Sequence, residues 1–265
     1  MNKKLVNIIV NCYNGEKYLK KNLESIQRQK YSNWELIFWD NQSSDNSKKV
    51  FDSFKDKRFK YYCSDKHTTL YEARNLACKK TNGEFIAFLD CDDWWYENFL
   101  SSRESFFNNE RYDFSYSNCH QYFEKSNKTE IYSKKKLPSG KIYDFLSKNY
   151  LVNINTLIVR KNSLEKINFF NPQFNIIGDF DAVMKICKHG EALAFQDPLA
   201  CIRIHGKNFH DENRKMFFEE FKIWFFSQLN DEIFKKNKNF FLKKLLYLFF
   251  VSLFPKFIKD FFKKK

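Results

Sequence analysis

The chain has 265 residues with 43% hydrophobic and 19% aromatic content, which excludes a disordered protein and suits one large domain, alone or with an appendage. Its net charge of +14 leaves two explanations open: a composition dominated by Lys, Asn and Phe, or an anionic partner such as a phosphorylated substrate, an acidic membrane face or nucleic acid. Seven scattered cysteines without a CxxC pair argue against a disulfide framework or zinc site and indicate a reducing compartment. We expect no secretory leader and no spanning helix, since no run approaches roughly 18 apolar residues.

Strands and helices alternate through the first 90 residues. Short apolar runs rich in branched and aromatic residues predict strands at 5–10, 34–40, 59–63 and 85–90. Apolar residues at helical spacing predict helices at 16–29, 44–54 and 70–80. This alternation predicts an α/β protein whose parallel sheet is joined by right-handed crossovers.

The alternation loosens after about residue 110. Further strands are predicted at 113–119, 154–160 and 191–206, the last with a proline break, and further helices at 178–190, 216–229 and 240–265. We therefore expect one domain over residues 1–206, with halves at 1–110 and 111–206, followed by a helical, basic and amphipathic extension over 207–265.

Three polar segments follow predicted strands: "NCYNGE" from residue 11, "DNQSSD" from residue 40 and "DCDD" from residue 90. Ligands of open parallel sheets bind beyond the carboxyl ends of the strands, although each segment alone also suits an ordinary turn. The packed carboxylates of "DCDD" repel one another unless a cation joins them. Mg²⁺ and Mn²⁺ prefer such oxygen ligands, so an Asp-x-Asp here predicts a site for a metal–diphosphate complex.

Four longer segments carry a resemblance to a known family: "NIIVNCYNGEKYLKKNLESIQRQ", "ELIFWDNQSSDNS", "ARNLACKKTNGEFIAFLDCDD" and "GDFDAVMK". From Val6 to about His205 the chain resembles the family 2 glycosyltransferases of the GT-A fold. The resemblance implies a Rossmann-like, mostly parallel central sheet flanked by helices, here with a C-terminal helical extension. It also implies inverting sugar transfer from a nucleotide donor with Mn²⁺ or Mg²⁺.

The resemblance assigns donor contacts to the first two loops. Tyr13 and Asn14 would line the nucleotide pocket, and Asp40 would hold the base or ribose. Ser43 lies in the same loop as Asp40. Asp45 is better interpreted as the cap of the helix that follows it.

The phosphate side of the donor site is assigned to the segment around "DCDD". Arg74 would reach the nucleotide or phosphate, with a surface salt bridge as the alternative. Asp90 would contact the ribose and Asp92 would ligate the metal. Asp93 is a candidate cap for a following helix.

Inverting transfer needs a carboxylate that removes a proton from the acceptor hydroxyl. The family places this base second in a Glu-Asp pair that opens a helix. Here Gly178 stands in the first position, which makes Asp179 the candidate base and Asp181 the fallback. A simple helix-capping role is the alternative for Asp179.

Further assignments fall on two later segments. In "CIRIHG", Arg203 or His205 would contact the donor diphosphate, although a lone His is often structural. Before "LIVR", Asn155 and Thr156 would touch the acceptor.

The tail is strongly basic and apolar. Residues 235–265 carry ten lysines and one acid, Asp260, beside many Phe and Leu. This composition predicts a helix lying on an anionic membrane surface, with an ordinary core helix as the alternative. We expect no nucleic-acid partner, because the charge is concentrated beside apolar residues.

We therefore expect an inverting, metal-dependent hexosyl- or N-acetylhexosaminyltransferase. It would use a UDP-sugar and a saccharide or lipid-linked saccharide acceptor in bacterial surface polysaccharide or lipopolysaccharide synthesis, at the inner face of the cytoplasmic membrane. The alternatives are a sugar-phosphate nucleotidyltransferase, a phosphohydrolase, or a non-catalytic membrane-associated nucleotide-sugar or glycan binder.

Overall fold

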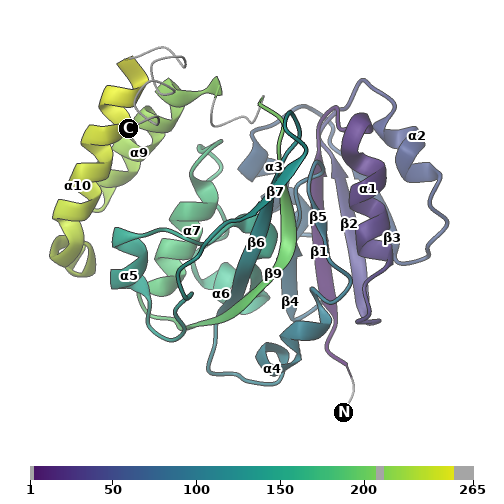
Figure 1. The fold of residues 1–265 in the computed structure, drawn as a ribbon, viewed down its shortest axis with the longest axis horizontal. Coiled ribbons are helices and arrows are strands. Elements are labelled where there is room, and N and C mark those ends of the chain that lie inside the picture. Colours follow the sequence, from purple (N-terminus) through teal and green to yellow (C-terminus); the bar gives the residue numbers. More distant parts are fainter. Residues whose placement is uncertain (1–2, 207–211, 254–265) are drawn as a thin grey trace.

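A computed structural model describes residues 3–206 and 212–253. Within them one sheet has the strand order β3-β2-β1-β4-β8-β6-β9-β5, with β7 beside β6 (Figure 1). Its strands are β1 (Val6–Cys12), β2 (Trp34–Asp40), β3 (Phe59–Cys63), β4 (Phe85–Phe88), β5 (Trp94–Trp95), β6 (Phe114–Phe123), β7 (Lys128–Ile131), β8 (Ile158–Arg160) and β9 (Ala192–Ile204). The α-helices are α1 (Glu16–Gln27), α2 (Ser47–Asp52), α3 (Leu70–Cys78), α4 (Glu104–Phe107), α5 (Tyr143–Lys148), α6 (Lys161–Lys166), α7 (Gly178–Cys187), α9 (Arg214–Ser227) and α10 (Glu232–Leu253), with 3₁₀ turns η1 (Ser101–Arg103) and η2 (Ile154–Thr156).

The predicted α/β fold is confirmed, and its parallel pairing lies mainly in the first half. Strands β3, β2, β1 and β4 are parallel neighbours, whereas β8 joins β4 and β6 antiparallel and β6 runs parallel to β9. Alternate residues of β1 face opposite layers: Ile8 and Val10 pack with α1, and Ile9 packs with α3 and α7. Helices therefore cover both faces, and the parallel strand ends remain open.

Several local predictions differ from the structure. Only 158–160 of the predicted strand at 154–160 pairs as a strand, because residues 154–156 form η2. Strand β9 continues through Pro198, where its register with β6 shifts. Helix α10 begins at 232 rather than 240, and the prediction for 254–265 lies outside the described residues.

The C-terminal helices share the apolar core of the domain. In Figure 1, α9 and α10 lie side by side at the opposite end of the molecule from α1 and α2. Phe221 and Trp224 of α9 and Phe241 of α10 are buried in the same cluster as Phe180 of α7. The extension thus packs directly on the helix that carries the candidate base.

Candidate active site

The loops after β1 and β2 leave the same edge of the sheet and are tied together. Cys12 and Asp40, the last residues of the two strands, are register partners. The backbone N–H of Asn14 donates to Ser43 Oγ at 2.9 Å, and Asn14 Oδ1 accepts from the backbone N–H of Ser44 at 2.8 Å. These bonds bring the predicted residues Asn14, Asp40 and Ser43 into one structure.

Asp40 is 2% exposed and both of its carboxylate oxygens are bonded. Oδ1 accepts from the backbone N–H of Ser43 at 2.7 Å, and Oδ2 accepts from the hydroxyl of Tyr61 at 2.6 Å. Burial and the neighbouring carboxylate raise the pKa of Tyr61, so its hydroxyl stays a donor. The local pattern did not single out Tyr61, which comes from β3.

Asp45 lies one residue before the N-cap of α2, which is Asn46, so it is not itself the predicted cap although it bonds the first residue of the helix. Its Oδ1 accepts from the backbone N–H of Ser47 at 2.9 Å. Its Oδ2 accepts from the backbone N–H of Glu16, also at 2.9 Å, so the same carboxylate fixes the start of α1. Asp45 therefore holds the two helices that frame the first loop.

A pocket of about 260 Å³ opens beside this loop. Tyr13, Asn41 and His67 line it, and the rings of Tyr13 and His67 lie 4.4 Å apart. Asn11 also lines the pocket, and neither polar atom of its buried side chain has a hydrogen-bond partner in the described part of the chain. An unpaired buried amide is costly, so Asn11 is suited to bind a ligand here. Sequence reasoning found Tyr13 but missed Asn11 and His67.

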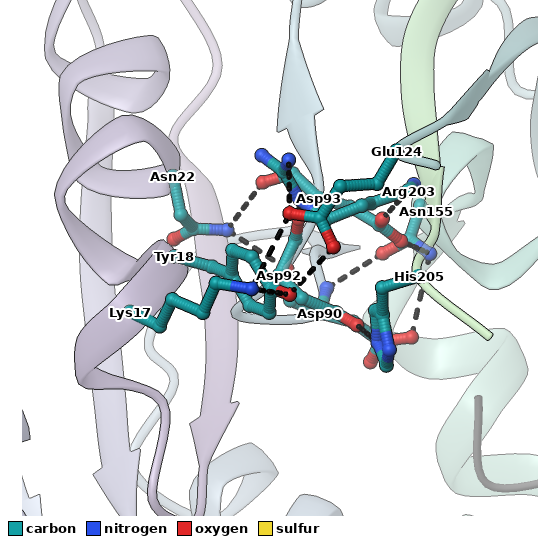
Figure 2. Close-up of polar contacts among 10 residues, drawn as sticks. All are labelled: Lys17, Tyr18, Asn22, Asp90, Asp92, Asp93, Glu124, Asn155, Arg203 and His205. Carbon is teal, nitrogen blue, oxygen red and sulfur yellow. Dashed lines mark hydrogen bonds and ion pairs between the residues drawn. The ribbon is translucent and has the colours of Figure 1, made fainter. Parts of the chain in front are cut away.

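The acidic loop at 90–93 is fixed from two neighbouring elements (Figure 2). Asn22 of α1 donates its amide N–H groups to the carbonyl oxygens of Asp90 and Asp93, at 2.8 and 3.0 Å. Asn155 of η2 accepts from the backbone N–H of Asp90 at 2.6 Å and donates to Asp93 Oδ2 at 2.7 Å. The loop is therefore rigid before any ligand binds.

The structure corrects the prediction that Asp93 caps a helix. The element that follows Asp93 is strand β5. The buried carboxylate of Asp93 accepts from the backbone N–H of Arg203 in β9 at 2.6 Å. Burial, and then the charges of Asp92 and Asp90, raise the pKa of Asp93. Asp93 thus joins the acidic loop to β9.

The acceptor roles predicted for Asn155 and Thr156 also need revision. Asn155 is 2% exposed and holds the acidic loop, while Thr156 is fully buried and donates to the carbonyl of Asn153. Neither side chain offers a surface to an acceptor. Asn155 is better described as a residue that positions Asp90 and Asp93.

Asp92 is a partly exposed carboxylate of this loop that contacts neither Arg74 nor Asn155. Its Oδ2 lies 3.2 Å from Nε2 of His205, and its side chain is 28% exposed. Arg203 donates its Nε–H to the carbonyl of Asp92 at 3.1 Å, and its guanidinium lies 4.5 Å from the ring of Tyr18. The predicted diphosphate contacts Arg203 and His205 therefore flank the predicted metal ligand.

Arg74 lies inside the site rather than on the surface. Its buried guanidinium forms an ion pair with the carboxylate of Asp90, so the alternative of a surface salt bridge is wrong. Asp90 and then Tyr71 and Asp179 favour the charged form and keep the pKa of Arg74 raised despite burial. Helix α3 thus places a cation between the acidic loop and α7.

Asp179 lies at the start of α7, facing α3. Its Oδ1 accepts from the hydroxyl of Tyr71 and from the backbone N–H of Phe180, at 2.9 and 2.8 Å. Burial raises the pKa of Asp179 above its ordinary value, opposed by the charge of Arg74. A carboxylate with a raised pKa beside a donor site is suited to accept a proton.

Asp181 is not placed to serve as the fallback base. Its carboxylate is 1% exposed, accepts from Trp224 Nε1 of α9 at 3.1 Å, and pairs with Lys185 at 2.7 Å. Residues two apart on a helix face different sides. Asp181 therefore points toward the C-terminal helices, whereas Asp179 faces α3.

Glu220 of α9 fixes the chain just before Asp179. Its buried carboxylate accepts from the backbone N–H groups of Asn175, Ile176 and Ile177, at 2.7, 2.9 and 3.1 Å. Nothing in the local sequence indicates this contact, which joins segments more than 40 residues apart.

A curled α/β sheet with acids and a pocket at its carboxyl edge defines the class of GT-A glycosyltransferases. The chain belongs to glycosyl transferase family 2, whose family model matches residues 7–186. Within the described residues, no helix combines the length and apolarity needed to cross a bilayer.

Known proteins extend this comparison. The chain is 34% identical over 165 residues to the Escherichia coli UDP-Glc:alpha-D-GlcNAc-diphosphoundecaprenol beta-1,3-glucosyltransferase WfgD, a match that covers 62% of this chain and 64% of the relative. Residues 1–349 of S. aureus TarS, solved with UDP-GlcNAc, superpose with a TM-score of 0.69 at 19% identity, covering 93% of this chain and 72% of that one. The mannosyltransferase PcManGT from Pyrobaculum calidifontis, solved with GDP-Man and Mn²⁺, superposes with a TM-score of 0.67 at 16% identity. The match covers 89% of this chain and 68% of that one. These two structures support the fold alone.

Proposed function

We propose that the protein transfers a hexose or N-acetylhexosamine from a UDP-sugar to a lipid-linked saccharide, with inversion, in bacterial surface polysaccharide synthesis. The observation that carries this proposal is the link between the two halves of the site. One helix, α3, holds Asp90 of the donor side through Arg74 and Asp179 of the acceptor side through Tyr71. The WfgD relative is a UDP-Glc:alpha-D-GlcNAc-diphosphoundecaprenol glucosyltransferase, which supports UDP-glucose and a GlcNAc-diphospholipid as the first substrates to test.

Each part of the site has a role in this reaction. The nucleotide would lie in the pocket lined by Tyr13 and Asn11, with Asp40 and Ser43 at its edge. Arg203 would hold the diphosphate, and Asp90 the ribose. Asp179 would take the proton from the acceptor hydroxyl as that oxygen attacks the anomeric carbon and the bond to the diphosphate breaks.

The residues present fit a divalent cation supplied jointly with the donor. The described residues contain no cluster of three His, Cys, Asp or Glu side chains that could hold a metal alone. Asp92 and His205 offer two ligands, and Mg²⁺ or Mn²⁺ is commonly held by one or two carboxylates plus substrate phosphates. When bound there, the ion would neutralise the charge of the departing diphosphate.

The test uses the full chain with a set of UDP-sugars, Mn²⁺ and a GlcNAc-diphospholipid. We expect acceptor-stimulated release of UDP and a product heavier than the acceptor by one sugar, detected by mass spectrometry. Formation of a nucleotide sugar from UTP and a sugar 1-phosphate would indicate a nucleotidyltransferase instead. Donor binding without product for any acceptor would indicate a binding protein, and phosphate release alone a phosphohydrolase.

We also propose that the α9–α10 pair docks on an anionic membrane surface. Twelve large hydrophobic side chains are exposed in the described residues, and ten of them lie on these two helices. They include Ile223 and Phe226 of α9 and Leu246 and Phe250 of α10, each at least 50% exposed. Helix α10 adds five lysines against one acid, which complements an anionic leaflet. Such docking would place the enzyme peripherally on the inner face of the cytoplasmic membrane.

Vesicle co-sedimentation tests this docking. The full chain should bind vesicles containing phosphatidylglycerol and not pure phosphatidylcholine vesicles, and the double variant Phe226→Asp/Phe250→Asp should bind about tenfold less. Ile131→Asp changes an exposed apolar residue on β7 and serves as the matched control with parental binding. Equal binding of both variants would remove the α9–α10 surface from the proposal.

A further inference from the structure

Asp179 is bonded through only one of its two carboxylate oxygens. In the described part of the chain, both hydrogen bonds to this side chain reach Oδ1, from Tyr71 and from the N–H of Phe180. No bond to Oδ2 is formed by those residues, and Asp179 as a whole residue is partly exposed. The carboxylate is therefore held by one oxygen and presents the other to a ligand.

The tyrosine that holds Oδ1 is itself rigid. Tyr71 is 2% exposed, and its ring lies 5.4 Å from that of Phe170 and 5.0 Å from the guanidinium carbon of Arg74. Burial and the charge of Asp179 raise the pKa of Tyr71 well above its usual value, so the hydroxyl remains a hydrogen-bond donor. A fixed donor of this kind determines the rotation of the carboxylate it contacts.

Gly178, the residue before Asp179, lies directly against the ring of Tyr71. Gly178 opens α7 directly against Tyr71, and a Cβ at this position would lie within 2.7 Å of three ring carbons. A side chain there would displace the ring, because a Cβ atom essentially never lies this close to a non-bonded atom. Gly178 and Tyr71 thus form one unit that places the hydroxyl on Asp179.

We propose that Tyr71 is a positioning residue for the base, which fixes Oδ1 of Asp179 so that Oδ2 receives the acceptor proton, and that Gly178 provides the space for it. This inference rests on the proposed function of Asp179. The proton moves from the acceptor hydroxyl to Oδ2, and the Tyr71 hydroxyl keeps its own proton while donating to Oδ1. A carboxylate free to rotate would spend part of its time with no oxygen toward the acceptor.

The same contact sets the pH at which the base is ionised. The hydroxyl of Tyr71 bonds to the ionised carboxylate and lowers the pKa of Asp179, against the larger effect of burial. The other titratable groups that face Asp179 are Arg74, Asp90, Tyr132, Tyr150 and Lys244 of α10. Loss of the Tyr71 hydroxyl leaves these groups in place, so it raises the pKa of Asp179 and moves the acidic limb of the rate profile to higher pH.

The experiment compares the pH dependence of kcat for Tyr71→Phe, Gly178→Ala and the double variant in the full chain. Tyr71→Phe keeps the ring, so we expect a near-parental Tm, an unchanged KM for the donor, a kcat about tenfold lower, and an acidic limb about one pH unit higher. Gly178→Ala should move the acidic limb in the same direction. The double variant should shift the limb and lower kcat little more than Tyr71→Phe alone. Tyr116→Phe removes a buried hydroxyl that donates to Pro138, at 2.7 Å, and should leave kcat and the limb unchanged.

A parental limb and kcat in Tyr71→Phe would overturn the positioning role, whatever Gly178→Ala does. An equal loss in Tyr116→Phe would assign the effect to general destabilisation and also overturn it. Asp179→Asn separates this failure from that of the proposed function. If Asp179→Asn is inactive and Tyr71→Phe is unaffected, only the positioning role of Tyr71 is wrong. If Asp179→Asn is active, Asp179 is not the base.

Discussion

Replacing Asp179 by Asn should lower kcat by about 10²–10⁴-fold while leaving donor affinity within a factor of two to three of the parent. The amide has the same shape and can still accept from Tyr71, but it cannot take a proton from the acceptor hydroxyl. The measurement pairs steady-state turnover with calorimetric titration of the UDP-sugar, so that binding and chemistry are read separately.

Asp181→Asn is the matched control, because it makes the same change two residues along α7. Its carboxylate bonds Trp224 and Lys185 in a buried position, so we expect a lower Tm with turnover per folded molecule retained. The opposite pattern, in which Asp181→Asn is inactive and Asp179→Asn turns over, would move the base to the other carboxylate and contradict the geometry of α7.

The proposed donor half of the site could be predicted because its signals are local. Strands β2 and β3 have the bounds that their apolar runs predict, and each ends where polar residues begin. Parallel strands necessarily bring their carboxyl ends to one edge, so Asp40, Asn14 and the loop at 90–93 could be grouped from their positions after strands.

The proposed acceptor half depends on contacts that no local pattern contains. Tyr71 and Asp179 are 108 residues apart, and Glu220 reaches Asn175 across 45. The local sequence suggests a helix cap at Asp93, whereas its partner, the backbone N–H of Arg203, comes from a strand 110 residues later. Asn155 was assigned to the acceptor since its polarity is visible in sequence, whereas its burial is not.

These distant contacts also give the C-terminal helices a role near the chemistry. Glu220 of α9 accepts three backbone N–H groups just before α7, and Trp224 bonds Asp181 within α7. Lys244 of α10 is desolvated, which lowers its pKa to about 8, and its charge is favoured by Asp179. The surface that we propose to meet the membrane is thus built on the same helices that hold the proposed base in place.

The second large effect is expected at the acidic loop, where Asp92→Ala should abolish the divalent-ion dependence of donor binding. Asp92 is the loop carboxylate that pairs with neither Arg74 nor Asn155. Its Oδ2 lies beside Nε2 of His205, so these two side chains can share a cation with a diphosphate. Without it, the affinity for the UDP-sugar in Mn²⁺ should fall at least about tenfold, toward the value of the parent in EDTA.

Calorimetric titrations of parent and variant, each with Mn²⁺ and with EDTA, give this result directly. Asp52→Ala removes an exposed aspartate paired with Lys48 on α2 and should retain the full metal response. A variant that loses Asp92 yet still binds the donor more tightly with Mn²⁺ than with EDTA would show that the ion is held elsewhere. The metal-binding role proposed for Asp92 would then be wrong.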